Sequence, residues 1–360
     1  MKTVTVNASK RYDVHIGLNL LKDAGQYIST IKGNCTAAII SNETIWPIYG
    51  NILEQSLTNA GFQVIHHTIP DGEAYKNGNT FLELLSFLAE NKITRSDMLI
   101  ALGGGVVGDI TGFTAATYLR GLDYVQIPTT LLAMVDSSVG GKTAIDLPQG
   151  KNLAGAFCQP KLVLCDTAVL QTLPSDIFVD GCAEVIKYGV LYDPELFAHL
   201  EQYGLAFERE YVISRCVALK RDVVVKDEFD NGERQKLNLG HTIGHAVEAL
   251  SQFTLSHGRS VAIGMGIVTK AAYTQGNCSK EVYARIYSIL KKFTLPYDLS
   301  EQHTLYPDRY TPEQLYRTAL SDKKRGGASV NLIIPIAIGN CSICKTAITQ
   351  LQTFIEKGLL

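Results

Sequence analysis

The stretch Met98-Leu-Ile-Ala-Leu-Gly-Gly-Gly-Val-Val-Gly108 decides the predicted fold of this chain. Its apolar residues are typical of a buried strand, and the glycines from Gly103 to Gly108 fit the pattern G-x-G-x-x-G. In that pattern a strand runs into a helix whose first N–H groups face a pyrophosphate. Asp109 follows directly, and Asp123 has the spacing of a ribose-binding acid. Because this is the third strand–helix unit rather than the first, a glycine-rich turn without a ligand is the alternative.

The segments around this stretch alternate between strands and helices. We expect strands at residues 37–40, 64–69, 98–102 and 124–127, and helices at residues 44–59 and 79–90 and from the glycines to about residue 118. Such alternation predicts a parallel sheet that helices cover on both faces.

Long helical patterns dominate after about residue 166. They cover residues 180–191, 208–226, 242–251, 261–274 and 280–293, and only residues 330–338 are typical of a strand or a pair of strands. The fold class predicted is therefore an α/β nucleotide-binding domain with a mostly parallel, Rossmann-like sheet over residues 1–172, followed by a mainly α-helical domain over residues 173–360. We expect the active site between the two domains.

The composition excludes several classes of protein. The 360 residues are 46% hydrophobic and 19% charged, which is enough to bury a large core and excludes bulk disorder. The 33 Lys and Arg against 35 Asp and Glu give a net charge of −2, so we expect no nucleic-acid partner. No apolar run reaches the 18 residues of a membrane span, and we expect no membrane partner.

The N-terminal residues and the cysteines indicate a cytoplasmic protein. Residues 1–7 alternate polar and apolar residues, without the apolar core of a secretion signal. Eight scattered cysteines are typical of reduced, buried thiols. The single pair Cys341-Ser-Ile-Cys344 is weak evidence for a zinc or redox site, because no second pair accompanies it.

The run Asp136-Ser-Ser-Val-Gly-Gly-Lys-Thr143 resembles a phosphate-binding P-loop. The P-loop pattern requires glycine where Asp136 stands, so an NTPase is disfavoured. A Gly-Gly-Lys-Thr turn can still hold one phosphate through backbone N–H groups and the charge of Lys142. The alternative is an ordinary loop with a solvated lysine.

The run His241-Thr-Ile-Gly-His245 places two imidazoles on one helical face. Thr242 stands where the metalloprotease motif requires Glu, which excludes that class. His257 follows within 17 positions, and two histidines with one carboxylate form a catalytic zinc set. Glu184 and Glu248 are both candidates for the carboxylate, and histidines that cap a helix or lie satisfied in the core are the alternative.

Glu184 and Lys187 share a helix face three residues apart. A surface ion pair would be the ordinary interpretation. The apolar neighbours Cys182, Ala183, Val185 and Ile186 instead indicate a buried helix, where such a pair is costly unless it is used.

Taken together, these motifs are similar to those of the 3-dehydroquinate synthase family, within the sugar phosphate cyclase superfamily. Further runs carry the resemblance in family order from about residue 40 to residue 325: Asp71-Gly-Glu-Ala-Tyr-Lys76, Leu119-Arg-Gly121, Pro128-Thr-Thr-Leu-Leu-Ala133, Gly150-Lys-Asn152, Ala183-Glu-Val-Ile-Lys-Tyr-Gly189, Asn238-Leu-Gly-His241, His257-Gly258 and Asp322-Lys-Lys324.

The resemblance implies a homodimeric lyase with one tightly held NAD and one divalent metal, usually zinc, with cobalt as the alternative. Its implied reaction converts 3-deoxy-D-arabino-heptulosonate 7-phosphate, a phosphorylated sugar acid, to 3-dehydroquinate and phosphate. This is the second step of the shikimate pathway, which leads to chorismate and the aromatic amino acids. The implied steps are transient oxidation by NAD, phosphate elimination, re-reduction and aldol cyclisation.

The resemblance also implies the site residues. The metal ligands would be Glu184, His241 and His257. The NAD contacts would be Asn42, Asp71, Gly72, Glu73, Tyr75, Lys76, Gly104, Gly105, Val106, Val107, Gly108, Asp109, Thr129, Thr130, Asp136, Lys142, Lys151, Val169, Leu170, Gln171 and Thr172. The catalytic and substrate-binding residues would be Lys142, Asn152, Lys187, Lys220, Asp230, Arg234, Asn238, His245 and Lys324, with Arg120 reaching the active site of the neighbouring subunit.

Two positions depart from the family pattern. Asp230 stands where Glu is usual, and Arg259 replaces the Glu that usually follows His257-Gly258. Three alternatives stay open: another sugar-phosphate cyclase, a metal-dependent polyol dehydrogenase with net redox chemistry, and a non-catalytic paralogue. The presence of Lys142, Asn152 and Arg234 favours a substrate with both a phosphate and a carboxylate.

Overall fold

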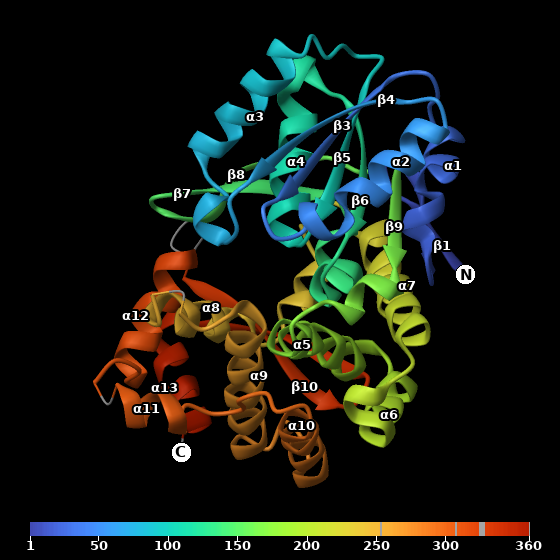
Figure 1. Ribbon diagram of the computed structural model, residues 1–360. Helices are drawn as coiled ribbons and strands as arrows, with labels where there is room; N and C mark the ends of the chain where they lie inside the picture. The colour runs from blue at the N-terminus through green and yellow to red at the C-terminus, as the bar shows by residue number, and fades with distance from the viewer. Residues whose placement is uncertain (253, 307, 324–327, 360) are drawn as a thin grey trace. The chain divides into compact units, whose positions relative to one another are not determined.

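The computed structural model describes residues 1–252, 254–306, 308–323 and 328–359. The chain divides into two compact units, of which the first comprises residues 1–174 and 209–229 and the second residues 175–208 and 230–360 (Figure 1). The domain prediction treated residues 1–172 and 173–360 as consecutive segments, whereas the structure groups the segment 209–229 with the first unit. Among the described residues, no helix is both long and apolar enough to cross a bilayer.

The first unit is built on a seven-stranded sheet in the order β1-β2-β9-β6-β5-β3-β4. All neighbouring strands are parallel except the pair β1–β2. The strands of this sheet are β1 (Lys2–Asn7), β2 (Arg11–Gly17), β3 (Thr36–Asn42), β4 (Gln63–Ile69), β5 (Met98–Gly103), β6 (Asp123–Pro128) and β9 (Leu162–Asp166). A separate antiparallel hairpin is formed by β7 (Lys142–Leu147) and β8 (Gly150–Phe157).

Helices accompany this sheet on both faces (Figure 1). They are α1 (Ala24–Ser29), α2 (Asn51–Asn59), α3 (Gly78–Glu90), α4 (Gly105–Thr117) and α7 (Arg209–Lys226). Strand residues Ala38 and Leu99 pack with Leu88 of α3 and Ala115 of α4, which places these two helices on the same face. Buried strands that alternate with helices along the chain thus produce the α/β architecture that the sequence predicts.

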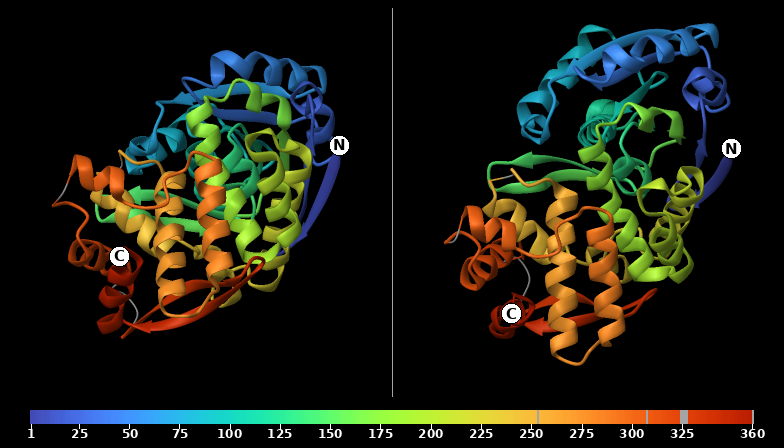
Figure 2. Two further views of the ribbon diagram at one scale, coloured as in Figure 1. Left: turned by 90° about the horizontal axis from the view of Figure 1, so that it is seen from below. Right: turned by 60° about the horizontal axis from the view of Figure 1, so that its bottom comes forward.

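The second unit is mainly helical. Its helices are α5 (Ser175–Tyr192), α6 (Pro194–Tyr203), α8 (His241–Leu250), α9 (His257–Thr274), α10 (Lys280–Lys292), α11 (Ser300–Leu305), α12 (Pro312–Lys323) and α13 (Ile348–Leu359). The strands β10 (Ser329–Ala337) and β11 (Asn340–Ala347) pair as a hairpin that contacts α5 and α9 (Figure 2). The fold-class prediction is confirmed. The segment 330–338, predicted as a strand or a pair of strands, is the single strand β10, and its partner β11 lies at residues that were not predicted as a strand.

Candidate active site

Helix α5 carries Glu184 and Lys187 into the core of the second unit. Glu184 is fully buried and Lys187 is 1% exposed, so the apolar flanks of this helix correctly indicate a buried pair. Lys187 Nζ forms an ion pair with Glu184 Oε2. Burial alone would raise the pKa of Glu184, but Lys187 and His241 hold it well below its usual value. The carboxylate is therefore a buried anion with its other oxygen, Oε1, directed at the histidines.

His241 is the first residue of α8, and its ring is oriented by the backbone. Its Nδ1 lies 3.1 Å from the carbonyl oxygen of Leu239, so an Nδ1–H donates there. Its Nε2 then faces Glu184 Oε1 at 3.4 Å. Burial and the neighbouring Lys187 lower the pKa of His241 to about 4, which keeps the imidazole neutral and able to coordinate a cation.

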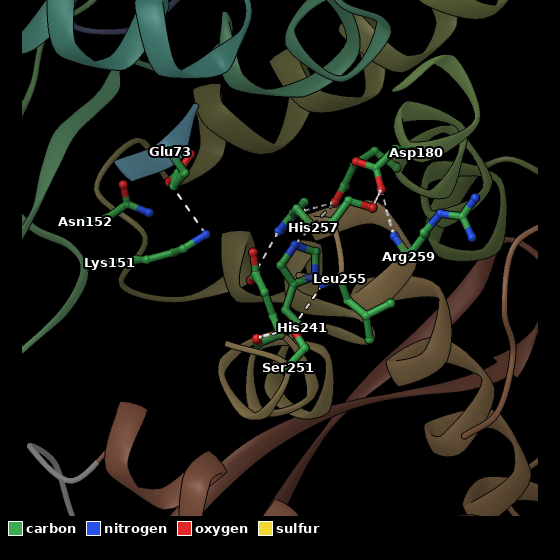
Figure 3. A network of polar contacts seen from close by, with 12 residues as sticks. Glu73, Lys151, Asn152, Asp180, His241, Ser251, Leu255, His257 and Arg259 are labelled. Atoms are coloured by element: carbon green, nitrogen blue, oxygen red, sulfur yellow. Dashed lines mark hydrogen bonds and ion pairs between the residues drawn. The ribbon is translucent and has the colours of Figure 1, made fainter. Parts of the chain in front are cut away.

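His257 is the first residue of α9 and faces two carboxylates (Figure 3). Its Nε2 lies 3.2 Å from Glu184 Oε1, and its Nδ1 lies 4.0 Å from Oε2 of the buried Glu248. Burial alone would lower the pKa of His257, but the two carboxylates raise it to about 10. In the absence of a metal ion, a proton on His257 therefore neutralises this cluster.

Three glycines allow α8 and α9, which carry the two histidines, to approach each other closely. A Cβ at Gly264 of α9 would lie 2.0 Å from the carbonyl oxygen of Gly240, and a Cβ at Gly244 of α8 would lie 2.9 Å from that of Ser260. Gly240 also has φ 78°, a left-handed conformation that favours glycine at the turn before His241. Contact between the two backbones thus sets the spacing of the histidines.

The cluster fits a divalent metal ion. One potential ligand atom from each of Glu184, His241 and His257 lies within 4.8 Å of the others. Two imidazoles and a carboxylate are a three-ligand zinc set with an open fourth position. His245, Glu248 and His257 form a second such group, so the structure brings together the histidines of residues 241–257 and both candidate carboxylates.

Other predicted site residues of the second unit lie near the start of α8. Arg234 is 2% exposed and, with Asn238, belongs to the short 3-10 helix Glu233–Asn238, while Asp230 has φ 60° in the loop before it. The ring of His245 lies 5.4 Å from that of His241, centroid to centroid. Lys324 lies outside the described residues.

In the first unit, the predicted NAD contacts follow the carboxyl ends of five parallel strands. Asn42 ends β3, the run from Asp71 to Lys76 follows β4, and the glycines from Gly104 follow β5. Thr129 and Thr130 come after β6, and the run from Val169 to Thr172 comes after β9. Carboxyl ends of parallel strands meet at one edge of a sheet, which is where open α/β sheets bind ligands.

The start of α4 has the shape that a pyrophosphate requires. Gly104 precedes the helix and Gly105 begins it. A Cβ on either glycine would lie 3.1–3.3 Å from a side-chain atom of Thr130 or Ser137, so a side chain would be tight at both positions. The first N–H groups of any helix lack partners within it and attract an anion. The predicted residues Val106, Val107 and Gly108 continue this first turn.

Lys76 holds the loop after β4 to its neighbours. This 4% exposed lysine lies 3.0 Å from Glu73 and 3.2 Å from Asp109, and it donates to Asn152 Oδ1 at 2.8 Å. Burial alone would lower the pKa of Lys76, but these carboxylates and Asp146 raise it above its usual value. Lys151 lies 3.6 Å from Glu73 (Figure 3), so five predicted site residues form one polar network.

The remaining predicted anion-binding residues of the first unit differ in environment. Lys142 begins β7 and is exposed. Lys220 of α7 is 6% exposed and donates to the carboxylate of Asp136 at 2.5 Å and to its carbonyl at 2.6 Å. Arg120 is exposed, with φ 67°. Its guanidinium makes no hydrogen bond or ion pair with any residue that the structure describes.

One expectation from the sequence is wrong, and two residues were missed. Asp123 begins β6, at the edge opposite the glycines, and it pairs with Lys32 at 3.0 Å and Lys161 at 3.4 Å, so it is not placed to bind a ribose. Asp146 accepts the backbone N–H of Asn152 at 2.8 Å, and Asp180 accepts that of Arg259 at 2.9 Å. No motif spacing assigns a role to either acid.

Comparison with known proteins decides the family. Residues 66–180 match the family model described as 3-dehydroquinate synthase N-terminal, and residues 181–325 match the one described as 3-dehydroquinate synthase C-terminal. The chain belongs to the 3-dehydroquinate synthase family. A 3-dehydroquinate synthase from Clostridium acetobutylicum is 43% identical over 99% of this chain and 99% of its own.

Solved structures of related cyclases share the fold. The 2-epi-5-epi-valiolone synthase of Streptomyces hygroscopicus, solved with NAD+ and Zn2+ bound, is 27% identical and superposes with a TM-score of 0.85 over 99% of this chain and 97% of its own. A 2-deoxy-scyllo-inosose synthase is 23% identical, with a TM-score of 0.87 over 99% of this chain and 100% of its own. The second likeness shows the fold alone.

Proposed function

We propose that this chain is a 3-dehydroquinate synthase, a lyase that converts 3-deoxy-D-arabino-heptulosonate 7-phosphate to 3-dehydroquinate and phosphate. Full-length similarity to relatives of that name supports this proposal. The observation that carries it is the buried cluster of Glu184, His241 and His257, because a chain that contains both a metal-ligand set and an NAD-type sheet edge fits a reaction that oxidises and polarises one substrate.

The cofactors we propose are NAD at the carboxyl edge of the sheet and zinc, with cobalt as a substitute, at Glu184, His241 and His257. When bound, the metal would polarise substrate hydroxyls and NAD would take up and return a hydride without net redox change. The neutral imidazole of His241 leaves a lone pair for the metal. The glycines from Gly104 leave backbone N–H groups for the pyrophosphate.

The cationic residues of the chain suit a substrate with two anionic groups. We propose that Lys142 and Asn152 bind its phosphate and that Arg234 binds its carboxylate. A cation at the departing phosphate stabilises the charge that develops as the C–O bond breaks. We propose Lys187, Lys220, Asp230, Asn238 and Lys324 as further substrate contacts, and His245 as the group that accepts or donates a proton.

We also propose that the enzyme is a homodimer in which Arg120 reaches the active site of the partner subunit. Arg120 is exposed, lies in a left-handed conformation and has no partner within the described part of its own chain. All eight cysteines are free thiols, which supports our proposal of a reducing, cytoplasmic location.

Phosphate release tests the proposed function. The purified protein, loaded with zinc and a catalytic amount of NAD, should release phosphate from the heptulosonate phosphate and lose this activity to a chelator. We expect Lys142→Ala to lower kcat/KM by about 100-fold or more, with unchanged far-UV circular dichroism. Release from glucose 6-phosphate instead would indicate another sugar-phosphate cyclase, and net NADH formation with glycerol would indicate a polyol dehydrogenase.

Subunit mixing tests the dimer. Arg120→Ala and Lys142→Ala should each be nearly inactive alone, and mixing them should restore part of the activity, because a mixed dimer contains one site with both residues intact. A monomer in sedimentation experiments, or a mixture no more active than its components, would contradict the shared site.

A further inference from the structure

The first turn of α9, which carries His257, is capped from another helix. Ser256 precedes α9 with extended backbone, and its own hydroxyl caps no N–H of the helix. The carboxylate of Asp180, on α5, instead accepts the backbone N–H of Arg259 at 2.9 Å and the hydroxyl of Ser256 (Figure 3). Asp180 therefore performs the task that an N-cap side chain performs within its own helix.

The two helices also touch through their backbones at this point. Gly258, the second residue of α9, is buried, and a Cβ there would lie 1.9 Å from the carbonyl oxygen of Asp180 and 2.8 Å from its Cγ. Only a residue without a side chain permits this approach. The start of α9 is thus held to α5 by direct contact and by two hydrogen bonds to one carboxylate.

These hydrogen bonds lie on both sides of one candidate metal ligand and one turn from another. Ser256 and Arg259 flank His257 in the chain, and Asp180 lies four residues before Glu184 on α5. His257 Nε2 and Glu184 Oε1 are 3.2 Å apart. Since metal sites require ligand distances within about 0.2 Å of their preferred values, a shift of the α9 terminus along α5 would disturb the ligand set.

We infer that Asp180 is a positioning residue of the metal site, which sets the register of His257 against Glu184 and thereby the metal affinity. The inference rests on the metal centre of the proposed function. Asp180 does not belong to either group of side chains that could hold the ion. Its effect passes through the N-terminus of α9, so its loss should alter metal binding without removing a ligand.

Zinc binding to the full-length protein, freed of metal beforehand, tests this role. We expect Asp180→Ala to weaken Zn2+ binding by about 10- to 100-fold, the range that orienting groups around metal sites show, in competition with a chromophoric chelator. Asp180→Asn keeps an oxygen acceptor for both hydrogen bonds and should stay within a few-fold of wild type. At saturating Co2+, the visible absorption of Asp180→Ala should differ from that of wild type.

The matched control is Ser279→Ala, because Ser279 caps α10 through a 3.2 Å hydrogen bond from Val282 N in the same unit. This variant should lower thermal stability and leave the zinc affinity unchanged. If Asp180→Ala binds Zn2+ as wild type does and only its melting temperature falls, Asp180 is merely a helix cap and the inference is wrong. A wild-type protein that binds no zinc would overturn it as well.

A second variant covers the case in which Asp180→Ala does not fold. Ser256 is exposed, and Ser256→Ala removes one of the two hydrogen bonds to Asp180. We expect this variant to weaken Zn2+ binding several-fold. Wild-type affinity in that variant would then overturn the inference. These assays contain no substrate, so they are independent of the proposed function. If the variants bind zinc more weakly but the wild-type protein releases no phosphate, the inference is supported and the proposed function is contradicted.

Discussion

Replacing Gly264 by alanine should disturb the metal centre from a distance. Gly264 lies on α9 where it crosses the start of α8, and an added Cβ would lie 2.0 Å from the Gly240 carbonyl oxygen and 2.8 Å from the Gly244 backbone nitrogen. Ordinary contact begins at 3.4 Å. Because backbone atoms cannot rotate away as a side chain can, α8 and α9 must separate by roughly 1.4 Å or tilt, a shift several times the tolerance of metal–ligand distances.

The substitution has a cost in stability and a cost in affinity. Overpacking of a well-packed core costs about 1–3 kcal/mol, and a clash between backbones belongs at the upper end of that range. The displacement acts between the helices that carry His241 and His257, so we expect Zn2+ affinity to fall by about 10-fold or more. The midpoint of urea unfolding, followed by circular dichroism, and a chelator competition measure the two effects.

A glycine without neighbours provides the control. A Cβ at Gly78, in the first turn of α3, would meet no atom within 4 Å. We therefore expect Gly78→Ala to leave zinc binding unchanged and to stabilise the protein by about 0.4–1 kcal/mol through the unfolded state. If Gly264→Ala keeps both its unfolding midpoint and its zinc affinity, the helix contact does not set the spacing of the histidines and the reasoning fails.

Three further predictions concern the first unit and the cysteines. Burial raises the pKa of Asp109 to about 6, despite the opposing charge of Lys76. Since the unfolded pKa is near 3.8, this carboxyl favours the folded state at low pH, and its contribution of up to about 3 kcal/mol is lost as pH rises from about 4 to 6. The variant Asp109→Asn should not lose this stability between about pH 4 and pH 6. If the free energy of unfolding depends on pH in the same way in wild type and variant, the prediction is wrong. Lys76→Met leaves Glu73 and Asp109 without their buried counter-charge and should lower the free energy of unfolding by about 3–5 kcal/mol. Asp109→Asn in the same chain should recover part of this loss, and urea unfolding measures both effects. All eight cysteines are free, so dithiothreitol should not change the melting temperature of the purified protein, and a lower value in reductant would reveal a disulfide.

Local sequence patterns were sufficient to predict four of the seven strands of the sheet. The strands near residues 39, 66, 100 and 125 are short apolar runs bounded by turn residues, and β3, β4, β5 and β6 occur there. The hairpin β7–β8 was missed because its glycines and lysines are typical of a phosphate-binding loop rather than of strands. Helix α7 was predicted as a helix, but its sequence does not show that it belongs to the first unit. Its place there depends on packing against β1 and β2.

Spacing identified the histidines of the metal cluster, whereas packing placed them. His241 and His245, four residues apart, indicate a shared helical face. His245 is closer to His257 in sequence than His241 is, yet it does not belong to the group that contains Glu184 and His241. His257 reaches that group because Gly240, Gly244 and Gly264 let two helix backbones meet. A single sequence contains no measure of such tertiary contacts, and the same holds for Asp180, whose carboxylate accepts the backbone N–H of Arg259 on another helix.

The sequence pattern left open whether Glu184 or Glu248 is the carboxylate of the metal-ligand set. In the structure the two carboxylates face different nitrogens of the His257 ring. Nε2 of His257 faces Glu184, and Nδ1 faces Glu248. An imidazole that coordinates a metal through Nε2 carries its proton on Nδ1, and a buried carboxylate at Nδ1 stabilises that tautomer and fixes the plane of the ring. The two carboxylates therefore have complementary positions, since Glu184 faces the nitrogen that we propose as a metal ligand and Glu248 faces the other nitrogen of the same ring.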